Sequence, residues 1–540
     1  MSSRQKHHTD GTDADVIVVG YGPIGQVLSI LLARAGWRVT VVERWESPYL
    51  LPRATSFDGE TARTLAALGI GSSFSRIGEP ADAYDWRNAT GTTLLRMDFS
   101  EVGPHGWPDA TTMHQPSLEA VLSDRASAFD EVRLLRGHTA AGLTDSGDRV
   151  ELTAETPKGD RATLTASWLV GCDGANSFVR DHMGVEVTDL GFSFDWLLCD
   201  VVLNEPREFV PANMQICDPA RPTTVVASGP GHRRWEFMRL PEEDIDELNL
   251  TATAWRLLKP FDVTPDNAML ARHTVYTFRA AWANTWRKGR LLLAGDAAHS
   301  MPPFTGQGMC SGIRDVLNLS WKLDLVLTGF SDERLLDTYG PERIGHVRET
   351  IETSVKLGKI VCVSDEAAAD SRDVALLAGL RTGRKPDRPT TQPLRNGLLY
   401  KNIGTVPAPP AGWVMPQGRV ARDGVAGLFD QVVGTGFALL STAELDSVLS
   451  GEHRRFLDSI GTHLVQIATG SAGSRAMGGA IVDLDDVYLP FLSSAKARFI
   501  LVRPDYHVFG AARSTRELTA VIGQLRTQLR ITETGHVSRH

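Results

Sequence analysis

The chain has 540 residues, which is too long for a single compact core, so we expect two or three domains. Its net charge is -9 and it contains no run of lysine or arginine, which argues against a nucleic-acid-binding protein. No apolar stretch approaches the roughly 18 residues of a membrane-spanning helix. The balance of 42% hydrophobic and 22% charged residues is typical of a globular enzyme.

The N-terminal residues 1–13 are polar and lack the apolar core of a signal peptide, so we expect a disordered leader and a cytoplasmic protein. The five cysteines are scattered and form no C-x-x-C pair, which is typical of reduced thiols. No group of residues has the spacing of metal ligands, so we predict no metal site.

The segment 15–44 has the pattern of a complete nucleotide-binding βαβ unit. A buried strand precedes the sequence G-x-G-x-x-G, a helix follows, and a second strand ends at Glu43. The glycines allow a tight turn with a pyrophosphate at the helix N-terminus, and Glu43 lies where a carboxylate binds ribose hydroxyls. The predicted contacts are Gly20, Gly22, Pro23, Ile24, Gly25, Glu43 and Arg44. No second such unit appears in the sequence, so any nicotinamide must bind without a Rossmann domain of its own, which favours tightly bound FAD.

The next elements are shorter. Asp58 begins a turn into a helix and is a candidate N-cap, and Gln115 lies at the start of another helix. In residues 132–166 strand-like runs alternate with turns, which is typical of an antiparallel hairpin. A strand then leads into the motif D-G-x-x-S-x-V-R, which starts at Asp173, and into a helix.

Residues 192–278 change to extended runs, which predict a larger antiparallel sheet. We expect this sheet to cover the cofactor and to form the substrate pocket. The tryptophan and phenylalanine among the candidates are also compatible with plain core, and Arg233 either binds a substrate carboxylate or is exposed on an edge strand. The candidate wall residues are Met214, Gln215, Arg233, Trp235, Phe237 and Arg239.

The segment 290–323 is the most informative part of the sequence. A short apolar strand ends at Gly295-Asp296, and a turn with two prolines and two glycines follows over residues 302–308. From Met309 onward apolar residues recur at helical spacing, so the free N–H groups of a long helix should face the turn. A ligand that can hold negative charge is favoured there.

Three motifs in this order carry a resemblance to a known family. The unit at residues 15–44, the motif from Asp173 and the segment from Gly295 to Met309 resemble those of single-component FAD-dependent aromatic hydroxylases. Residues 309–323 are most similar to the branch of 3-(3-hydroxyphenyl)propionate hydroxylases.

The resemblance implies roles for particular residues. Asp296 would hold the ribityl chain, and the turn with Pro303, Gly306, Gly308 and Met309 would lie along the isoalloxazine. Arg53 would contact the pyrophosphate region, Gln115 the flavin side of FAD, and Asp173 both FAD and the nicotinamide. The implied reaction uses NADH or NADPH to reduce FAD, adds O₂ to give a C4a-hydroperoxide and hydroxylates a phenolic ring.

Asp58 has two readings. It is either the helix N-cap or, as the first acid of the family's D-x-E-x-x-R segment, a base that accepts the phenol proton. Two departures from the family stand out. Tyr21 lies between the first two glycines, where its ring either crowds the adenine or packs outward, and Gly59 replaces a second acid, which weakens the assignment of phenylpropionate as the substrate.

Beyond residue 400, strands and a closing helix resemble the thioredoxin-like domain of one subgroup of these hydroxylases. It has no cysteine, so we expect packing or assembly, including a homodimer, rather than dithiol chemistry. The predicted fold is α/β: a Rossmann-type FAD-binding domain (14–190 and 280–395, with a linker at 381–393), an interleaved antiparallel-sheet substrate domain like that of para-hydroxybenzoate hydroxylase (191–279), and the domain 400–540.

Three other functions stay open. A monooxygenase that tailors a polycyclic polyketide, by hydroxylation or Baeyer–Villiger oxidation, would share all of these motifs. A flavin-dependent halogenase would share the first, but the sequence has no W-x-W-x-I-P motif. A flavin-binding protein without catalysis, which uses its C-terminal domain for assembly, is the third.

Overall fold

The computed structural model describes residues 11–381, 392–402, 406–468 and 479–532. Most of the expected leader and most of the expected linker lie outside the described residues. The described chain contains no helix long and apolar enough to cross a membrane.

The first layer is a mainly parallel sheet with the strand order β17-β18-β11-β1-β2-β8. Its central strand β1 is buried at all six positions, as expected for a strand covered on both faces. An antiparallel pair, β9 and β10, extends β11 and forms the hairpin that the sequence predicts. The strands are β1 (Ala14–Val19), β2 (Val39–Glu43), β8 (Val132–Arg136), β9 (Thr139–Asp145), β10 (Val150–Glu155), β11 (Arg161–Gly171), β17 (Arg287–Lys288) and β18 (Leu291–Leu293).

Helices cover this sheet. The helix α1 follows the glycine turn and packs against α8, whose side chains are buried over most of its length. Three short strands form a separate small sheet in the order β3-β7-β4. The elements are α1 (Pro23–Arg34), α2 (Gly59–Ala67), α4 (Gln115–Ser127), α5 (Phe178–Met183), α8 (Gly308–Leu327), α9 (Tyr339–Val361), α10 (Glu366–Arg381), β3 (Ser56–Asp58), β4 (Gly78–Pro80) and β7 (Ala110–Met113).

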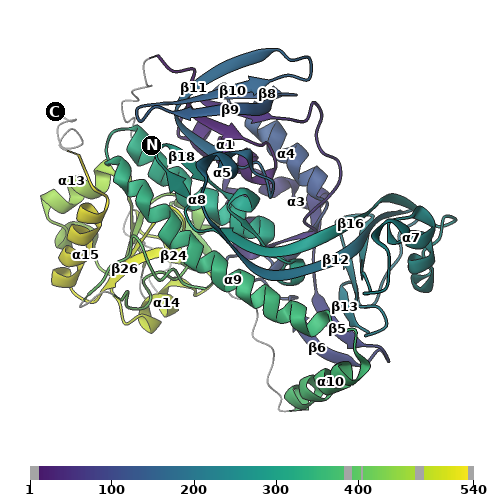
Figure 1. The fold of residues 1–540 in the computed structure, drawn as a ribbon. Coiled ribbons are helices and arrows are strands. Elements are labelled where there is room, and N and C mark those ends of the chain that lie inside the picture. Colours follow the sequence, from purple (N-terminus) through teal and green to yellow (C-terminus); the bar gives the residue numbers. More distant parts are fainter. Residues whose placement is uncertain (1–10, 382–391, 403–405, 469–478, 533–540) are drawn as a thin grey trace.

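The second layer is the predicted antiparallel sheet, with the order β19-β16-β12-β15-β14-β13-β5-β6. Two long strands, β12 and β16, run from the first layer into this sheet (Figure 1). The helices α6 and α7 cover its outer face. The elements are β5 (Ala83–Asn88), β6 (Thr93–Asp98), β12 (Val187–Leu203), β13 (Met214–Cys217), β14 (Thr223–Ala227), β15 (His232–Met238), β16 (Ala268–Ala283), β19 (His299–Ser300), α6 (Ile245–Leu248) and α7 (Thr251–Leu258).

One boundary differs from the expected division. We predicted that residues 14–190 belong to the FAD-binding domain, but β5 and β6 complete the far edge of the second sheet. The cause is a parallel pairing in which β5 lies beside β13, about 130 residues later in the chain. Local sequence patterns cannot reveal such a pairing.

The C-terminal part forms a four-stranded sheet in the order β23-β22-β25-β26, and three further strands are ordered β21-β20-β24. Strands β22 and β23 are parallel, and β25 and β26 are antiparallel. This part packs against α8, where Trp321 and Leu325 join its apolar core (Figure 1). The elements are β20 (Arg419–Arg422), β21 (Val425–Leu428), β22 (Ala438–Ser441), β23 (His463–Gln466), β24 (Val482–Asp483), β25 (Phe499–Val502), β26 (Val508–Ala512), α11 (Phe429–Val432), α13 (Gly451–Ser459), α14 (Tyr488–Ser494) and α15 (Thr515–Gln528).

Candidate cofactor and substrate site

The turn between β1 and α1 uses its glycines in two different ways. A Cβ atom at Gly20 would lie 2.5 Å from the Cys172 carbonyl oxygen, and one at Gly25 would lie 2.1 Å from the Gly20 carbonyl oxygen. A Cβ atom at Gly22 would meet no atom within 4 Å. Gly20 and Gly25 are therefore required by packing, whereas Gly22 leaves open space before α1. The helix begins with Pro23 and has no side-chain cap, so its first N–H groups can bind an anion.

The end of β2 carries Glu43, whose two carboxylate oxygens accept the backbone N–H groups of Tyr21 at 2.7 Å and Trp45 at 2.9 Å. The Tyr21 ring does not point toward the open space. It is buried, its hydroxyl approaches Ser123, and the Arg136 guanidinium lies over it. Arg44 is exposed beside the Trp45 ring.

The segment with Gly295 and Asp296 lies against this turn. A Cβ atom at Gly295 would lie 3.0 Å from Ile24, and one at Gly312 of α8 would lie 2.7 Å from it. Ile24 thus packs between two glycines and brings the first and third motifs together. The half-buried carboxylate of Asp296 makes no side-chain hydrogen bond within the described residues.

The turn at residues 302–307 leads into α8. Pro303 and Gly306 are exposed, Gly306 has a φ of +64°, and Gly308 and Met309, which begin α8, are half-buried. The helix has no side-chain cap and no acidic residue in its first turn. It therefore offers free N–H groups and the positive end of a helix dipole to a ligand beside the turn.

Gln115 and Asp173, which we predicted as cofactor contacts, form hydrogen bonds with neighbouring backbone and side-chain groups. Gln115 at the start of α4 accepts the backbone N–H groups of Arg53 at 2.9 Å and Ala54 at 2.7 Å, while the Arg53 guanidinium is exposed over the Tyr49 ring. Asp173 accepts the Ser177 hydroxyl and the Val179 N–H at the start of α5. Burial raises the pKa of Asp173. Gln115 and Asp173 hold backbone in place here, and Arg53 is free to reach a ligand.

Asp58 is the N-cap of α2, since its carboxylate accepts the Thr61 N–H at 2.8 Å. The same carboxylate pairs with Arg314 of α8, which also donates to Glu60 at 2.8 Å and to Gln307 at 2.8 Å. Burial raises the pKa of Asp58, but the charge of Arg314 and the hydrogen bonds from Thr61 together outweigh burial, so the pKa lies below its usual value. The cap reading is confirmed, and the carboxylate is also half of a buried ion pair.

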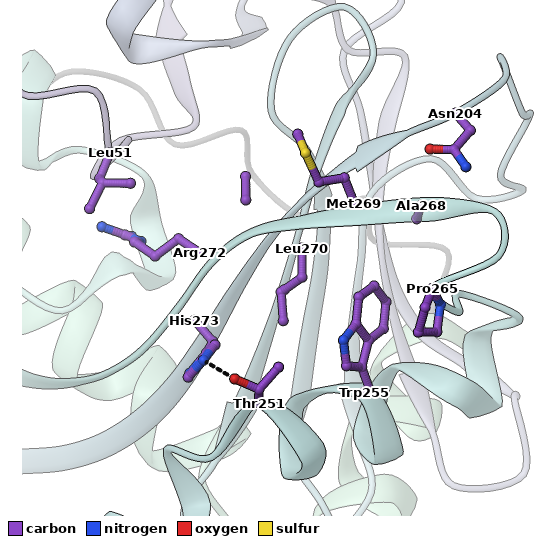
Figure 2. A pocket seen from close by; sticks show the side chains of 11 residues that line it. Leu51, Asn204, Thr251, Trp255, Pro265, Ala268, Met269, Leu270, Arg272 and His273 are labelled. Atoms are coloured by element: carbon purple, nitrogen blue, oxygen red, sulfur yellow. Dashed lines mark hydrogen bonds between the residues drawn. The ribbon is translucent and has the colours of Figure 1, made fainter.

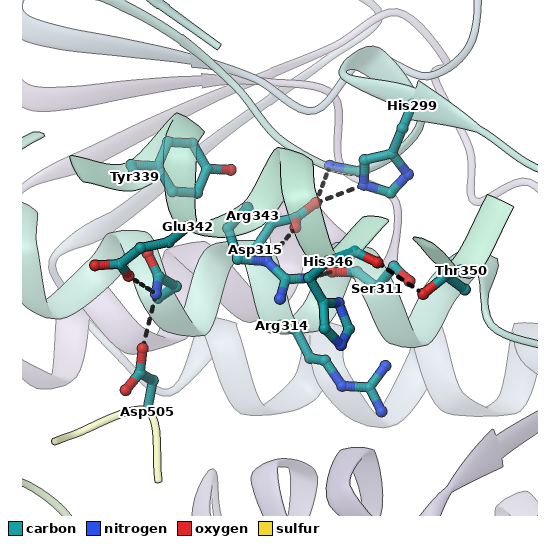
Figure 3. Close-up of polar contacts among 12 residues, drawn as sticks. His299, Ser311, Arg314, Asp315, Tyr339, Glu342, Arg343, His346, Thr350 and Asp505 are labelled. Carbon is teal, nitrogen blue, oxygen red and sulfur yellow. Dashed lines mark hydrogen bonds and ion pairs between the residues drawn. The ribbon is translucent and has the colours of Figure 1, made fainter. Parts of the chain in front are cut away.

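One residue that positions the site was not predicted from the sequence. Asp315 of α8 accepts the Gly295 N–H at 3.1 Å, the His299 Nε2 at 2.7 Å and the Arg343 Nε at 2.9 Å (Figure 3). It therefore holds the turn that carries Asp296. In the sequence, Asp315 is a charged residue among the apolar residues of a helix, which indicates a buried polar contact. The sequence does not show that its partner is the backbone of Gly295.

The second sheet presents two different faces, and strand alternation divides the predicted pocket residues between them. Trp235 and Phe237 are fully buried on the outer face under α7, and Met214 packs there too. Arg233 stacks on Phe209 on the same side. Met214, Trp235 and Phe237 therefore lie on the face away from Phe304, as plain core residues do, whereas Arg233 also lines a small cavity with Pro52, Asp200 and Arg272. Arg239 is held by Asp195 and by the Glu243 carbonyl.

The inner face is the one that contacts the turn. Trp196 and Phe278 lie edge-on to the Phe304 ring, with centroids 6.1 Å apart in each case. Gln215 faces this side as predicted, but its amide binds the Thr223 carbonyl and the Thr224 hydroxyl. Cross-strand register adds the inner-face residues that the sequence analysis missed: Trp196, Leu198, Asp200, Thr224, Arg234, Glu236, Met238, Tyr276 and Phe278.

An open cavity of about 720 Å³ lies elsewhere, at the start of β16 beside α7 (Figure 2). Leu51, Trp255, Leu270 and Arg272 line it, and His273 bonds Thr251 there at 2.9 Å. None of the predicted pocket residues lines this cavity.

The residues around the Gly22 and Pro303 turns fit FAD. Two uncapped helix N-termini, open space at Gly22 and an Asp296 carboxylate without a hydrogen bond from the described part of the chain are features that suit a dinucleotide with a ribityl chain. These observations come from this chain alone.

Comparisons with known proteins agree. A family model described as an FAD binding domain matches residues 13–354, and one described as the HcaD C-terminal domain matches residues 412–528. The chain is 37% identical, over 95% of its length and 94% of the relative's, to a probable NADH-specific resorcinol 4-hydroxylase of Rhodococcus jostii (strain RHA1). It is 35% identical, over 85% of its length and 81% of the relative's, to a 3-(3-hydroxy-phenyl)propionate/3-hydroxycinnamic acid hydroxylase of Mycolicibacterium gilvum (strain PYR-GCK).

Solved structures share the fold. The flavin-dependent monooxygenase PieE, in complex with FAD and substrate, matches with a TM-score of 0.79 at 20% identity over 96% of this chain and 99% of that one. Aklavinone-11 hydroxylase matches with a TM-score of 0.76 at 21% identity, again over 96% and 99%. From the family models, the relatives and the geometry together, this chain belongs to the FAD-dependent aromatic hydroxylases.

Proposed function

We propose that this enzyme uses NADH or NADPH and O₂ to hydroxylate a small phenol. The observation that carries this proposal is the position of the Pro303 turn, between the uncapped start of α8 and the inner face of the second sheet. That arrangement supports a flat ligand along the turn, with the sheet face left for a second ring. When bound, FAD supplies the transfer of electrons from the nicotinamide and the activation of oxygen.

The residues of the chain would bind the cofactor and tune its surroundings. The start of α8 would favour negative charge on the ring, and Phe304, Trp196 and Phe278 would keep water away from it. The residues that we propose to hold FAD are Gly20, Gly22, Pro23, Ile24, Gly25, Glu43, Arg44, Arg53, Gln115, Asp173, Gly295, Asp296, Pro303, Gly306, Gly308 and Met309.

The substrate class follows the relatives with the higher identity. Both are named for single-ring phenols, and the names that mention larger ring systems come from matches near 20% identity, which support the fold alone. We therefore propose a small phenol as the substrate in preference to a polyketide. The NADH specificity in one relative's name makes NADH the first reductant to test.

The test is to load the purified chain with FAD and to measure NADH and NADPH oxidation with resorcinol and with 3-(3-hydroxyphenyl)propionate, followed by mass analysis of the product. We expect faster oxidation with a phenol and a product that has gained one oxygen atom. Oxidation that no phenol accelerates would contradict the proposal and favour a flavin-binding protein without catalysis. A polycyclic phenol is added to the same assay, and acceleration by that compound alone would favour a polyketide substrate.

Several finer features belong to the same proposal. We propose that the C-terminal domain is thioredoxin-like, because β22 and β23 are parallel around α13 and are followed by the antiparallel pair β25 and β26. A cytoplasmic location and a homodimer are also proposed. The role of Asp58 as the phenol base is a proposal that its lowered pKa does not favour.

A further inference from the structure

Glu236 is a buried carboxyl group without a hydrogen-bond partner on the inner face of the second sheet. Its side chain is 9% exposed, and it makes no hydrogen bond within the described residues. The nearest cation is Arg234, whose Nη1 lies 3.7 Å away, beyond hydrogen-bond distance. Arg234 instead donates to Asp200 and to the carbonyl groups of Pro52 and Arg53.

The register of the sheet shows what Glu236 faces. In β15 it is flanked on the same face by Met238, opposite Trp196, and by Arg234, opposite Asp200. The Trp196 ring contacts the Phe304 ring in the Pro303 turn. The Arg234 guanidinium donates a hydrogen bond to the Arg53 carbonyl. Glu236 therefore lies between the two segments that border the proposed flavin, on the side where a substrate ring would rest.

Two further polar groups on this face also have no hydrogen-bond partner within the described residues. The indole N–H of Trp196 is buried and unpaired. The Tyr84 hydroxyl of β5 makes no hydrogen bond, and burial together with the charge of nearby Glu236 raises the pKa of Tyr84. Unpaired buried polar groups are costly, so the unpaired Trp196 indole, beside the Glu236 carboxyl and the half-buried Tyr84 hydroxyl, indicates a ligand with polar groups on this face.

The group that would pair with Glu236 is a hydrogen-bond donor. Burial raises the pKa of Glu236 and leaves its oxygens without a donor from the protein. A hydroxyl on the substrate ring meets this need, whereas a carboxylate does not. The arginines of the inner face would bind a substrate carboxylate only weakly, because Asp200 already pairs with both Arg234 and Arg272.

From this geometry we infer that Glu236 is a substrate-contacting residue that accepts a hydrogen bond from a hydroxyl of the phenol and selects neutral hydroxylated rings over rings with an acidic side chain. The inference rests on the proposed function and deepens it. It assigns the recognition of the substrate to the sheet and not to α2.

The test uses the FAD-loaded enzyme and the variants Glu236→Gln and Glu236→Leu. The matched control is Glu242→Gln, which removes the same charge from an exposed position in the loop after β15. The dissociation constants for resorcinol and 3-(3-hydroxyphenyl)propionate are measured from the change in flavin absorbance, and KM and kcat from product formation.

We expect both Glu236 variants to bind resorcinol at least tenfold more weakly, with a larger effect on KM than on kcat. We expect the ratio of the two dissociation constants to shift toward 3-(3-hydroxyphenyl)propionate, and FAD content to match that of the control. Unchanged resorcinol binding in both variants, in a wild-type enzyme that hydroxylates phenols, would overturn this inference and leave the proposed function intact. A wild-type enzyme that turns over neither phenol would overturn both.

Discussion

At the scale of single residues, Asp58 and Glu236 show how surroundings assign different tasks to two carboxyl groups. Asp58 caps α2 and pairs with Arg314, and its pKa is lowered. Glu236 has no hydrogen bond within the described residues, and its pKa is raised by burial. A carboxylate that accepts hydrogen bonds from an arginine is a weak base, while one without such a hydrogen bond can accept a hydrogen bond from a ligand.

We predict that Asp58→Asn lowers thermal stability more than turnover. Asparagine keeps the cap but removes one of the two carboxylates that compensate the buried Arg314, at a cost on the order of 3 kcal/mol. Melting temperature and kcat per bound FAD are measured together. The matched control is Asp244→Asn, an exposed N-cap that forms no ion pair within the described residues. A loss of about 100-fold in kcat with an unchanged melting temperature would instead identify Asp58 as the base.

At the scale of elements, the turn between β1 and α1 separates glycines that packing requires from the one that a ligand requires. Gly20 and Gly25 have no room for a Cβ atom, and Gly22 has room on its open side. Sequence alone presents all three as one motif. For Gly20 the distinction requires the position of the segment after β11, because the Cys172 carbonyl approaches the turn from a distant part of the chain.

We predict that Gly22→Val folds but loses FAD. Its Cβ atom would enter the open space before α1 and have no protein atom within 4 Å, so we expect the apoprotein to melt close to wild-type apoprotein. FAD content, measured from the ratio of absorbance at flavin and protein wavelengths, should fall at least tenfold. Gly25→Ala serves as the contrast, because its Cβ atom would lie 2.1 Å from the Gly20 oxygen and should reduce folding itself. Full FAD content in Gly22→Val would show that the cofactor lies elsewhere.

At the scale of the whole molecule, buried charges join the C-terminal domain to the helices of the cofactor site. Glu342 of α9 binds Arg503 at 2.6 Å and Lys322 of α8 at 2.9 Å, and Asp505 completes this cluster. Arg63 of α2 pairs with Asp430 at 2.7 Å. The helix α8, which carries Asp315, is therefore bonded both to α9 and to the C-terminal domain. We expect the C-terminal domain to support the geometry of the cofactor site.

We predict that Glu342→Gln lowers stability by about 3–5 kcal/mol, because it leaves Arg503 and Lys322 in the interior with less compensation. The control is Glu352→Gln in the same helix, which removes an exposed ion pair with Arg348 that solvent screens, so we expect little change in stability. Both are measured by thermal melting at pH 7. Equal melting temperatures for the two variants would show that the cluster does not support the fold.

The same cluster predicts how stability depends on pH. Burial opposes the charge on Glu342, but Arg503 and Lys322 outweigh burial and lower its pKa from 4.5 to about 2. A lowered folded-state pKa adds stability that is present above pH 4.5 and is lost as pH falls toward 2. We expect the melting temperature of wild type to fall across this window and that of Glu342→Gln to fall less. An identical pH profile for the two proteins would contradict the assignment.

The sequence alone determined the features that depend on local pattern. The G-x-G-x-x-G turn, the Gly295-Asp296 turn and the start of α8 were predictable because each is set by neighbouring residues, and together they identified the cofactor and the family. The antiparallel character of the second sheet was also predictable from its extended runs.

Only the tertiary structure decided which side chains meet. Trp235 and Glu236 are adjacent in the sequence, but strand alternation buries one under α7 and turns the other toward the flavin turn, and only the packing of α7 and Phe304 shows which face is which. Arg314 and Asp58 are 256 residues apart in the sequence, and β5 pairs with a strand that lies about 130 residues later. Contacts between distant segments depend on how the layers pack, and one sequence does not record that packing.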